Sequence, residues 1–563
     1  FGASLFALSL ALSPLSAYAV PPEIEFSTFL GGTVYDSIRD MAVDTQGNIY
    51  VTGGTSSPNF PVTAGSYQTV LGQGQLPDDP STTSPIDVFV VKFSPTGSLL
   101  WATFVGGPNN DRAYAIEVDN AGYIYLGGRA GRGFPVTAGA FLPTFQSSPN
   151  TAPYGPQDGF VAKLSPDGRQ LIWSSFFGSS DELIVRDIDV DRVTGEVYLA
   201  SATSGAAFPS AISSRFNNSP KGGNDAVFAK IRADGAQVLW ATYVGGTGFE
   251  DHQNSIRVDS NGNLYGLTTT QSSNIATSGA FDTTYGGGGD EFVVKLSPSN
   301  GALIWGAYIG GSLNESTETH ELAGTDANGN VYVTGPTRST DFPTTTGAFQ
   351  RTFGGGVNDA FVMKISSNGS TLLASTYLGG SVNDRPEGTY VAPNGMVFFS
   401  GVTGSPNFPV TPNAFRTTLG GGVDAFAAVL SADLSSVVYA TYLGGTLTEG
   451  GRGAVGDGRG NFYFGGDSLS LDFPTKNAFQ SVYGGGSGGD GFFARLTLTG
   501  PGTSPCDVNS DGSVNGIDIQ LSVNQALLLL PCTADINNDG SCNVVDVQRV
   551  GNNILGAQCL TGP

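Results

Sequence analysis

Two twelve-residue segments near the C-terminus carry the oxygen-bearing side chains that a calcium ion needs. The segments are DVNSDGSVNGID from Asp507 and DINNDGSCNVVD from Asp535. Each has Asp, Asn and Asp at its first, third and fifth positions, Gly at its sixth and Asp at its twelfth. Calcium takes hard oxygen ligands, and these side chains, with the carbonyl of the seventh position, supply them around a tight glycine turn. The tandem loops predict two calcium ions; a pair of Asx-rich turns is the structural alternative.

A second group of acidic residues recurs along the rest of the chain, each soon after a Gly-Gly motif or its equivalent. The group consists of Asp36, Asp111, Glu182, Glu250, Glu315, Asp384 and Glu449. If the segments that carry them form a ring, the seven carboxylates lie around one mouth of a central channel. They then either bind cations or a basic ligand, or serve only as acceptors of backbone hydrogen bonds in their loops.

The four cysteines, Cys506, Cys532, Cys542 and Cys559, all lie near the C-terminus. An even number of cysteines in a small exported domain predicts two disulfides, for which three pairings exist. Because Cys506 and Cys559 bracket the segment, we favour a bond between them and a second bond between Cys532 and Cys542. A zinc site is disfavoured because the sequence has no C-x-x-C pair.

No arrangement of residues in the sequence predicts a catalytic site or an organic cofactor. The two histidines, His252 and His320, have no neighbouring His or Cys that would complete a metal site. Ser487 stands in a GGSGG segment that matches a nucleophile elbow. That segment leads into an expected strand, whereas a nucleophile elbow leads from a strand into a helix.

The elements that must position these residues repeat along the chain. A strand signature such as STFLGG or ATYLGG occurs in seven copies, whose aromatic residues are Phe29, Phe104, Phe176, Tyr243, Tyr308, Tyr377 and Tyr442. Between copies, runs such as IEVDNAGYIYLGG from Ile116 and DGFVAKLSPDG from Asp158 alternate in polarity around Gly-containing turns. Regular spacing indicates a repeat architecture, and the alternation predicts three further strands in each unit.

Radially repeated four-stranded sheets are the blades of a β-propeller. The sequence therefore predicts an all-β fold for residues 23–498, a seven-bladed β-propeller. The seventh unit has no fourth strand behind it, whereas the chain opens on one, Glu23 to Leu30. We expect this N-terminal strand to complete the last blade, since an incomplete blade would expose an unpaired edge.

Long connections within the units carry a Phe-Pro dipeptide followed by Gly-Ala-Phe-Gln, as at Phe342 and Phe349. Connections of this length usually have structure of their own or a function. We expect a single helical turn at Gly-Ala-Phe-Gln, whose Phe fills the gap between blades.

Four tryptophans, Trp101, Trp173, Trp240 and Trp305, occupy the same place in the signature strand. Segments such as TGSLLW resemble the tryptophan-docking motif of quinoprotein dehydrogenase propellers, but the Ala-x-Asp of that motif is absent upstream. We expect the tryptophans to pack between blades. A carbohydrate-active or quinone-dependent propeller enzyme is the alternative function.

The repeats, for example AVDTQGNIYVTGGTSSPNFPVTAGSYQ from Ala42, resemble the seven-bladed beta-propeller repeat (SBBP) family of secreted bacterial and archaeal proteins. The resemblance implies the propeller fold and export. The family has no common catalytic residues, so the resemblance implies no activity.

After a linker at residues 499–505, residues 506–563 resemble a dockerin type I domain, because each loop leads directly into one helix. The resemblance implies calcium ligands at Asp507, Asn509, Asp511, Ser513, Asp518, Asp535, Asn537, Asp539, Ser541 and Asp546. It also implies that loop positions 10 and 11 face a cohesin-like protein partner. These residues are Gly516, Ile517, Val544 and Val545, whereas cellulosomal dockerins commonly have polar residues there. We therefore expect an apolar partner surface that differs from that of an ordinary cohesin.

The charge and the N-terminus indicate the environment of the protein. With 25 Lys and Arg against 48 Asp and Glu, the net charge is -23, which makes nucleic acid an improbable partner. Residues 1–19 form an apolar segment that ends in Ala17-Tyr18-Ala19, the pattern of a signal peptide without its basic start; an apolar N-terminal arm is the alternative. No other stretch approaches the length of a membrane helix.

Together these features predict an extracellular or cell-surface, non-enzymatic binding or scaffold protein. Its C-terminal module is expected to bind a protein partner, and its propeller face a glycan or a basic ligand.

Overall fold

The structure is a computed structural model. It describes residues 22–72, 86–148, 155–181, 183–204, 207–250, 253–259, 262–315, 321–485, 488–498, 506, 508, 516–527, 532, 536 and 541–554. Residues Glu23–Thr497 form one compact unit, and the chain from Leu498 onward belongs to a second.

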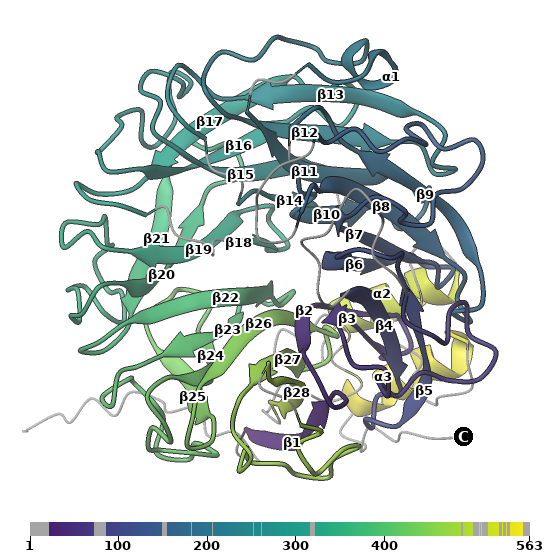
Figure 1. Cartoon of the computed structure of the whole chain (residues 1–563). Helices are drawn as coiled ribbons and strands as arrows, with labels where there is room; N and C mark the ends of the chain where they lie inside the picture. The colour runs from purple at the N-terminus through teal and green to yellow at the C-terminus, as the bar shows by residue number, and fades with distance from the viewer. Residues whose placement is uncertain are drawn as a thin grey trace, which may run out of the picture. The chain divides into compact units, whose positions relative to one another are not determined.

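The first unit is a ring of seven four-stranded antiparallel sheets, which confirms the predicted seven-bladed propeller (Figure 1). In blades 1 to 7 the innermost strands are β2 (Asp36–Val43), β6 (Arg112–Val118), β10 (Asp187–Val190), β14 (Ser255–Val258), β18 (Glu321–Thr325), β22 (Asp384–Val391) and β26 (Glu449–Gly456). The second strands are β3 (Ile49–Thr55), β7 (Ile124–Ala130), β11 (Val197–Thr203), β15 (Leu264–Thr270), β19 (Val331–Thr337), β23 (Val397–Thr403) and β27 (Asn461–Ser468).

The outer half of each blade contains the Asp-initiated strand and the Gly-Gly strand seen in the sequence. The third strands are β4 (Asp87–Phe93), β8 (Asp158–Leu164), β12 (Asp225–Ile231), β16 (Asp290–Leu296), β20 (Asp359–Ile365), β24 (Asp424–Leu430) and β28 (Asp490–Thr497). The fourth strands are β5 (Leu99–Val105), β9 (Leu171–Phe177), β13 (Val238–Val244), β17 (Leu303–Ile309), β21 (Leu372–Leu378), β25 (Val437–Leu443) and, for blade 7, β1 (Glu23–Leu30). A one-turn helix, α1 (Ser210–Ser213), lies in the long connection of blade 3.

The N-terminal strand closes the ring, as the sequence predicts. The sheet of blade 7 has the order β1-β28-β27-β26, with Phe29 of β1 opposite Phe492 of β28. The other edge of β1 is also paired, because the Ser27 and Phe29 amides donate to the Lys476 and Gln480 carbonyls. β1 is therefore the outermost strand of blade 7, and the loop that carries Lys476 and Gln480 covers its outer edge at Ser27 and Phe29.

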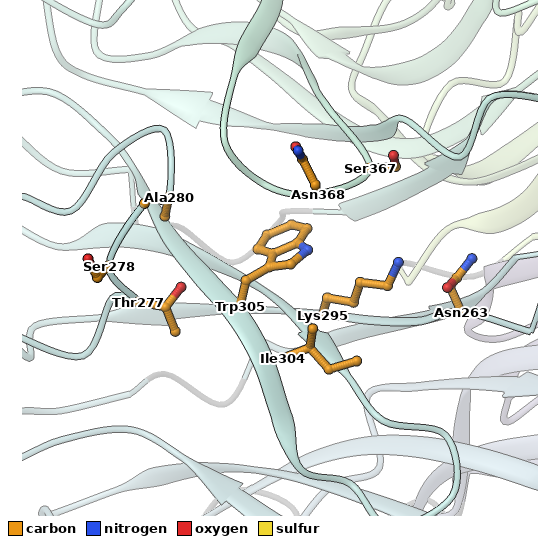
Figure 2. Close-up of a pocket in the computed structure, with 10 residues that line it drawn as sticks. Asn263, Thr277, Ser278, Ala280, Lys295, Ile304, Trp305, Ser367 and Asn368 are labelled. Atoms are coloured by element: carbon orange, nitrogen blue, oxygen red, sulfur yellow. The ribbon is translucent and has the colours of Figure 1, made fainter.

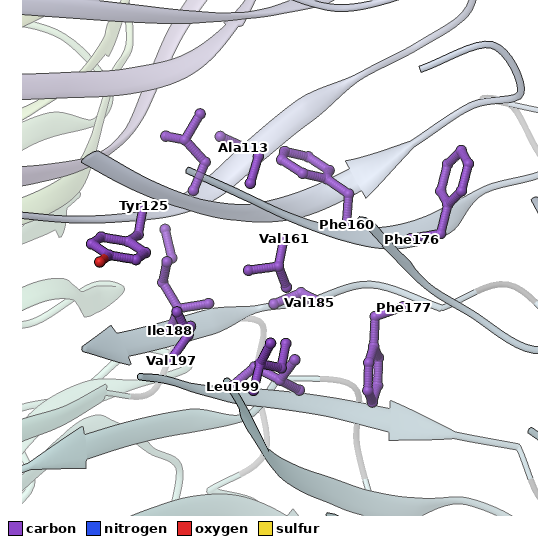
Figure 3. Close-up of a cluster of buried hydrophobic side chains, with 14 of the residues drawn as sticks. Ala113, Tyr125, Phe160, Val161, Phe176, Phe177, Val185, Ile188, Val197 and Leu199 are labelled. Atoms are coloured by element: carbon purple, nitrogen blue, oxygen red, sulfur yellow. The ribbon is translucent and has the colours of Figure 1, made fainter. Parts of the chain in front are cut away.

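The core of the propeller lies between neighbouring blades as well as within them. One continuous cluster joins blades 1, 2 and 3, and Figure 3 shows its part between blades 2 and 3. There Phe160 and Val161 of β8 lie near Val185 and Ile188, which come from the entry to blade 3 and from β10. Both faces of these strands are buried, which explains why they are apolar with few interruptions.

The Phe-Pro loop of blade 5 differs from the sequence-based expectation, whereas the equivalent Phe141 of blade 2 is 7% exposed and lies in the core. The phenylalanine that precedes proline is the buried one: Phe342 is 3% exposed, and its ring lies 4.4 Å from that of Phe361 in the same blade. The phenylalanine of Gly-Ala-Phe-Gln at Phe349 is 38% exposed, and its segment is a turn, not a helical turn. Its backbone N–H nevertheless reaches the next blade, where it donates to the carbonyl of Leu434 at 2.9 Å.

Among the residues that the structure describes, no helix is both long and apolar enough to cross a membrane.

Candidate functional site

The second unit contains the two longest described helices, α2 (Gly516–Ala526) and α3 (Val544–Ile554), which pack against each other. Each helix begins at the tenth position of a predicted calcium loop. Cys506, Ile536 and Val550 form the buried core between these elements. Each loop therefore leads directly into its helix, as the sequence predicts.

The last acidic residue of each loop is buried and turned toward the start of the same loop. Asp518 is 0% exposed and Asp546 is 1% exposed. Oδ1 of Asp518 accepts the Val508 N–H at 2.7 Å, and Oδ1 of Asp546 accepts the Ile536 N–H at 2.8 Å. Val508 and Ile536 are both second residues of their loops, so the two loops share the same geometry here.

Three of the ten predicted calcium ligands, Asp518, Ser541 and Asp546, lie in the described part of the chain. The other seven, Asp507, Asn509, Asp511, Ser513, Asp535, Asn537 and Asp539, lie outside it. Every predicted ligand offers oxygen, and each position-12 carboxylate accepts an N–H from the second residue of its loop. This donor set fits a hard cation such as Ca²⁺.

A disulfide joins Cys532 to Cys542, as favoured from the sequence. Cys506 is also disulfide-bonded. Its expected partner, Cys559, lies outside the described residues, so that pairing stays a prediction.

Two of the four predicted partner-binding residues, Val544 and Val545, form an exposed apolar patch at the start of α3. Val544 is 75% exposed and Val545 is 40% exposed. Gly516 and Ile517 begin α2 at the equivalent positions, but their side chains lie outside the described part of the structure.

Comparison with known families agrees with this geometry. Residues 25–61 match the beta-propeller repeat (SBBP) model, and residues 505–555 match the dockerin type I domain. The chain thus combines a seven-bladed propeller, in which one segment matches this repeat, with a C-terminal segment that matches the dockerin type I domain. Dockerin domains generally bind calcium and cohesin-type protein partners, which makes this module the leading site for interaction.

Similarity over longer spans is weaker. The regulatory protein FlaEY of Caulobacter vibrioides is 25% identical over 342 residues, which cover 53% of this chain and 32% of that protein. The propeller chain thus spans about a third of the length of that relative. Among solved structures, Kuenenia stuttgartiensis hydrazine synthase is 10% identical with a TM-score of 0.39, covering 80% of this chain and 96% of that one. The quinohemoprotein alcohol dehydrogenase of Comamonas testosteroni is 10% identical with a TM-score of 0.38, covering 87% and 78%. Likeness at this level carries no information about activity.

In the propeller, the six described members of the acidic group are buried where one blade passes to the next. In every described case the second glycine of the motif donates its N–H to the carboxylate four residues later, as Gly32 does to Asp36 at 2.7 Å. Thr55 and Ser57 donate to the same carboxylate. This is the hydrogen-bonding role expected as the structural alternative. None of these six carboxylates is accessible from solvent, as binding of a cation at the channel mouth would require. Glu182 lies outside the described residues.

A second carboxylate occupies each of these corners. In the six described corners it belongs to the first residue of the third strand: Asp87, Asp225, Asp290, Asp359, Asp424 or Asp490, all of them buried. Asp158 is the equivalent buried residue of β8. A Cβ added to Gly245 would lie 2.4 Å from carboxylate oxygens of both Asp225 and Glu250, so two acids share one glycine corner. Burial raises the pKa of Asp87 and of Asp490 to about 7. The recurrent Asp is visible in the sequence, but its pairing depends on the corner geometry.

The residues weighed for catalysis, His252, His320 and Ser487, lie outside the described residues. Within the ranges that the structure describes, no group of three or more His, Cys, Asp or Glu residues could hold a metal ion.

The tryptophans pack between blades, as expected. Trp173 lies beneath Gly235 in the hairpin turn of the next blade, where an added Cβ would lie 2.3 Å from the indole. The indole N–H donates to the Ala233 carbonyl of the same turn at 2.9 Å. Trp240 makes the equivalent bond to Pro298 at 3.1 Å. These contacts account for the repeated tryptophan without a cofactor.

A pocket of about 680 Å³ lies beside the fourth tryptophan (Figure 2). Lys295, Ile304 and Trp305 of blade 4 line it together with Ser367 and Asn368 from the hairpin turn of blade 5. Trp305 is 6% exposed, so its ring packs against the next blade and offers no open face to a ligand.

Proposed function

We propose that this chain is an exported, non-enzymatic scaffold protein, whose propeller is joined to a protein partner by the dockerin domain. Two observations support the proposal: the seven-bladed fold and the match to a dockerin type I domain. The disulfide between Cys532 and Cys542 favours an oxidising, extracellular location. Residues 1–19, the expected signal peptide, lie outside the described residues.

The exposed apolar patch at the start of α3 is the main observation that supports this proposal. A valine that is 75% exposed beside another that is 40% exposed leaves apolar surface in water unless a partner covers it. α2 and α3 begin at the same position of their loops, so Gly516 and Ile517 of α2 are equivalent to Val544 and Val545 of α3. We propose that the module can present either residue pair, at the start of α2 or at the start of α3, to the partner. This gives two binding orientations.

We also propose that two calcium ions hold these helix starts in place. The buried carboxylates of Asp518 and Asp546 belong to the first turn of α2 and of α3. An ion bound by each loop would therefore fix the start of a helix, and partner binding should require calcium.

The experiment is capture of the partner from the secretome of the source organism by the purified full chain, with and without chelator. We expect capture only in calcium. We expect the double substitution Ile517→Asp and Val545→Asp to abolish it without loss of bound calcium, and each single substitution to be partly tolerated. Removal of an apolar anchor from an interface centre costs about 2 kcal/mol or more, roughly thirtyfold in affinity.

Val193→Asp is the matched control, because Val193 is an 85% exposed valine on the propeller. It should leave capture unchanged. Capture that survives chelation, or that survives the double substitution, would contradict the proposed site. Tight binding to an ordinary cellulosomal cohesin would contradict the expected apolar surface.

A further inference from the structure

The pocket beside Trp305 brings two hydrogen-bond donors of neighbouring strands together. Trp305 lies on β17, and Lys295 lies directly opposite it on β16. Both side chains line the cavity of about 680 Å³, and the indole nitrogen lies on the side of the ring toward Lys295 (Figure 2). Pockets of roughly 300 to 1,000 Å³ are the usual sites of small organic ligands. The two donors therefore meet in a cavity of the size that holds a small ligand.

The indole N–H of Trp305 differs from those of the equivalent tryptophans in blades 2 and 3. Trp173 and Trp240 each donate to a carbonyl in the hairpin turn of the next blade. Trp305 packs in the same way against Gly369, where an added Cβ would lie 2.5 Å from the indole. Its side chain is 6% exposed, yet its Nε1 has no hydrogen-bond partner among the described residues. Buried indole N–H groups usually have an acceptor, so this one is an exception.

The ammonium group of Lys295 is an exception of the same kind. Lysine is the sixth residue of the third strand in blades 1 to 5, and in the other four of these blades it forms an ion pair at 2.6 to 3.8 Å. Lys295 forms no such pair within the described ranges of the chain, and its Nζ lies 5.1 Å from the ring centroid of Tyr265. Both donors that face each other across β16 and β17 thus lack the partner that their equivalents have.

The electrostatic surroundings of Lys295 agree with these contacts. Burial lowers the pKa of the Lys295 ammonium, and the attraction of the Asp259 carboxylate does not offset that effect. Asp259 instead accepts two N–H groups of Asn263 at 2.8 Å. At the equivalent Lys230 burial acts in the same direction, but its interactions, first among them the hydrogen bond with Glu196, outweigh burial and raise the pKa. The positive charge at the pocket is therefore less compensated than its equivalent in blade 3.

The rest of the pocket offers polar contacts beside an apolar surface. Oδ1 of Asn368 accepts two serine hydroxyls of its own turn, which leaves the amide N–H groups of Asn368 for other contacts. Ser278 and Ser367 add hydroxyl groups to the lining, and Ile304, which is 53% exposed, adds apolar surface. A few polar groups around an apolar surface fix the orientation of a ligand that itself has several hydroxyl groups.

We propose that this pocket binds the carboxylate of a sugar acid, such as a hexuronic acid unit of an acidic polysaccharide. The Lys295 ammonium pairs with the carboxylate, since hydrogen bonds between charged groups are the strong ones. No ion pair fixes the Lys295 side chain, so it can shift toward the ligand, and the buried indole N–H of Trp305 then donates to a second ligand oxygen. Asn368 contacts the sugar hydroxyls. This site belongs to the propeller and does not depend on the dockerin domain, so either proposal can fail without the other.

The test is calorimetric titration of the full chain with sodium galacturonate at constant ionic strength. Galactose, which lacks the carboxylate, and sodium acetate, which lacks the sugar ring, are the comparison ligands. We expect each of them to bind at least about tenfold more weakly than galacturonate, because each loses one set of hydrogen bonds. No saturable binding of galacturonate, or equal or tighter binding of galactose or acetate, would overturn the proposal.

The contribution of the ammonium is tested by Lys295→Gln. This variant should weaken binding of galacturonate at least about tenfold, because it removes the charge that selects the carboxylate. Lys230→Gln is the matched control, because Lys230 lies opposite Trp240 in blade 3 but forms an ion pair with Glu196 at 2.6 Å. It should leave the affinity unchanged. Equal affinities of the wild type and Lys295→Gln would show that the ammonium does not bind the ligand.

Tryptophan fluorescence separates binding in the pocket from a structural role of Lys295. Galacturonate should change the emission of the full chain, and this change should be lost in Trp305→Phe. It should persist in Trp240→Phe, because Trp240 already donates its N–H to the Pro298 carbonyl. Thermal melting of both variants measures any loss of packing between the blades. An emission change that persists in Trp305→Phe would mean that the ligand binds elsewhere and that the proposal is wrong.

Discussion

Pairs of residues form the contact between neighbouring blades, one on the fourth strand of a blade and one on the facing hairpin turn. The sizes of the two side chains are complementary. Where the fourth strand carries Trp173, the facing hairpin turn has Gly235, with a φ of 69°. Where it carries Ala374, the equivalent turn has the buried Leu434, also at positive φ. Volume absent from one partner is thus present in the other, as close packing requires.

The glycine above a tryptophan should tolerate no side chain. Gly235→Ala is expected to lower the free energy of unfolding by about 1 to 2 kcal/mol for its positive φ, and by a further ~1 to 3 kcal/mol for collision with the indole. Gly139→Ala is the matched control, because Gly139 has a φ of 84° but nothing within 4 Å of an added Cβ. Chemical denaturation measures both variants. Equal losses would show that the indole contact contributes nothing.

The buried corner aspartates should make the propeller less stable at higher pH. Burial raises the pKa of Asp87, Asp158 and Asp359 from 3.8 to about 7. Between these values the folded state keeps protons that the unfolded state has released, so the free energy of unfolding falls as pH rises. We expect a higher thermal midpoint near pH 5 than near pH 8.

The pH dependence should weaken when a corner carboxyl is replaced. Asp87→Asn mimics the protonated acid and should flatten the slope of stability against pH. Asp167→Asn is the control, because Asp167 is exposed, pairs with Ser165 and has a lowered pKa. A midpoint that rises from pH 5 to pH 8 in the wild type would rule out this assignment.

At the scale of elements, β1 joins the beginning of the propeller to its end. Phe26, Phe29 and Leu30 of β1 are buried in blade 7 or against blade 1. Burial of each is worth about 1.5 to 3 kcal/mol. The strand therefore contributes much of the closure of the ring.

A chain that begins at Gly31 should lose this closure. We expect a lower unfolding midpoint and oligomers that form through the open edge of β28. The control is a chain that begins at Pro22, which keeps β1. Thermal melting and light scattering compare the two, and a monomer with an unchanged midpoint would contradict the role of β1.

At the scale of the whole molecule, the propeller and the C-terminal module are two units with different means of stabilisation. The propeller has continuous apolar clusters between its blades. The C-terminal module has a described core of three fully buried side chains together with a disulfide. Small domains of this kind usually need a metal or a cross-link for stability.

Removal of calcium should therefore unfold one unit and spare the other. We expect chelation to lower the helix signal and the midpoint of the C-terminal transition in calorimetry, while the propeller transition stays unchanged. Asp507→Ala combined with Asp535→Ala should reproduce the effect without chelator. Two results would refute calcium binding at two sites. One is that the purified wild-type chain contains no calcium, and the other is a single unfolding transition whose midpoint does not change with chelator.

The sequence by itself determined the features that arise from local pattern. Alternating polarity and Gly-containing turns specify strands, and regular copies of the Gly-Gly motif specify seven blades. The unmatched strand at Glu23–Leu30 specifies the closure of the ring. The predicted calcium loops before α2 and α3 are equally local, because their predicted ligands lie within twelve consecutive residues.

The tertiary structure alone decided which distant residues share a site. Asp225 and Glu250 meet across Gly245 because the corner between two blades folds back, and sequence spacing does not fix that geometry. Trp305 and Asn368 line one pocket because the outer strands of blade 4 pack against the hairpin turn of blade 5. Strand periodicity depends on the φ and ψ angles of adjacent residues, whereas such proximity depends on how whole blades pack, which no local pattern records.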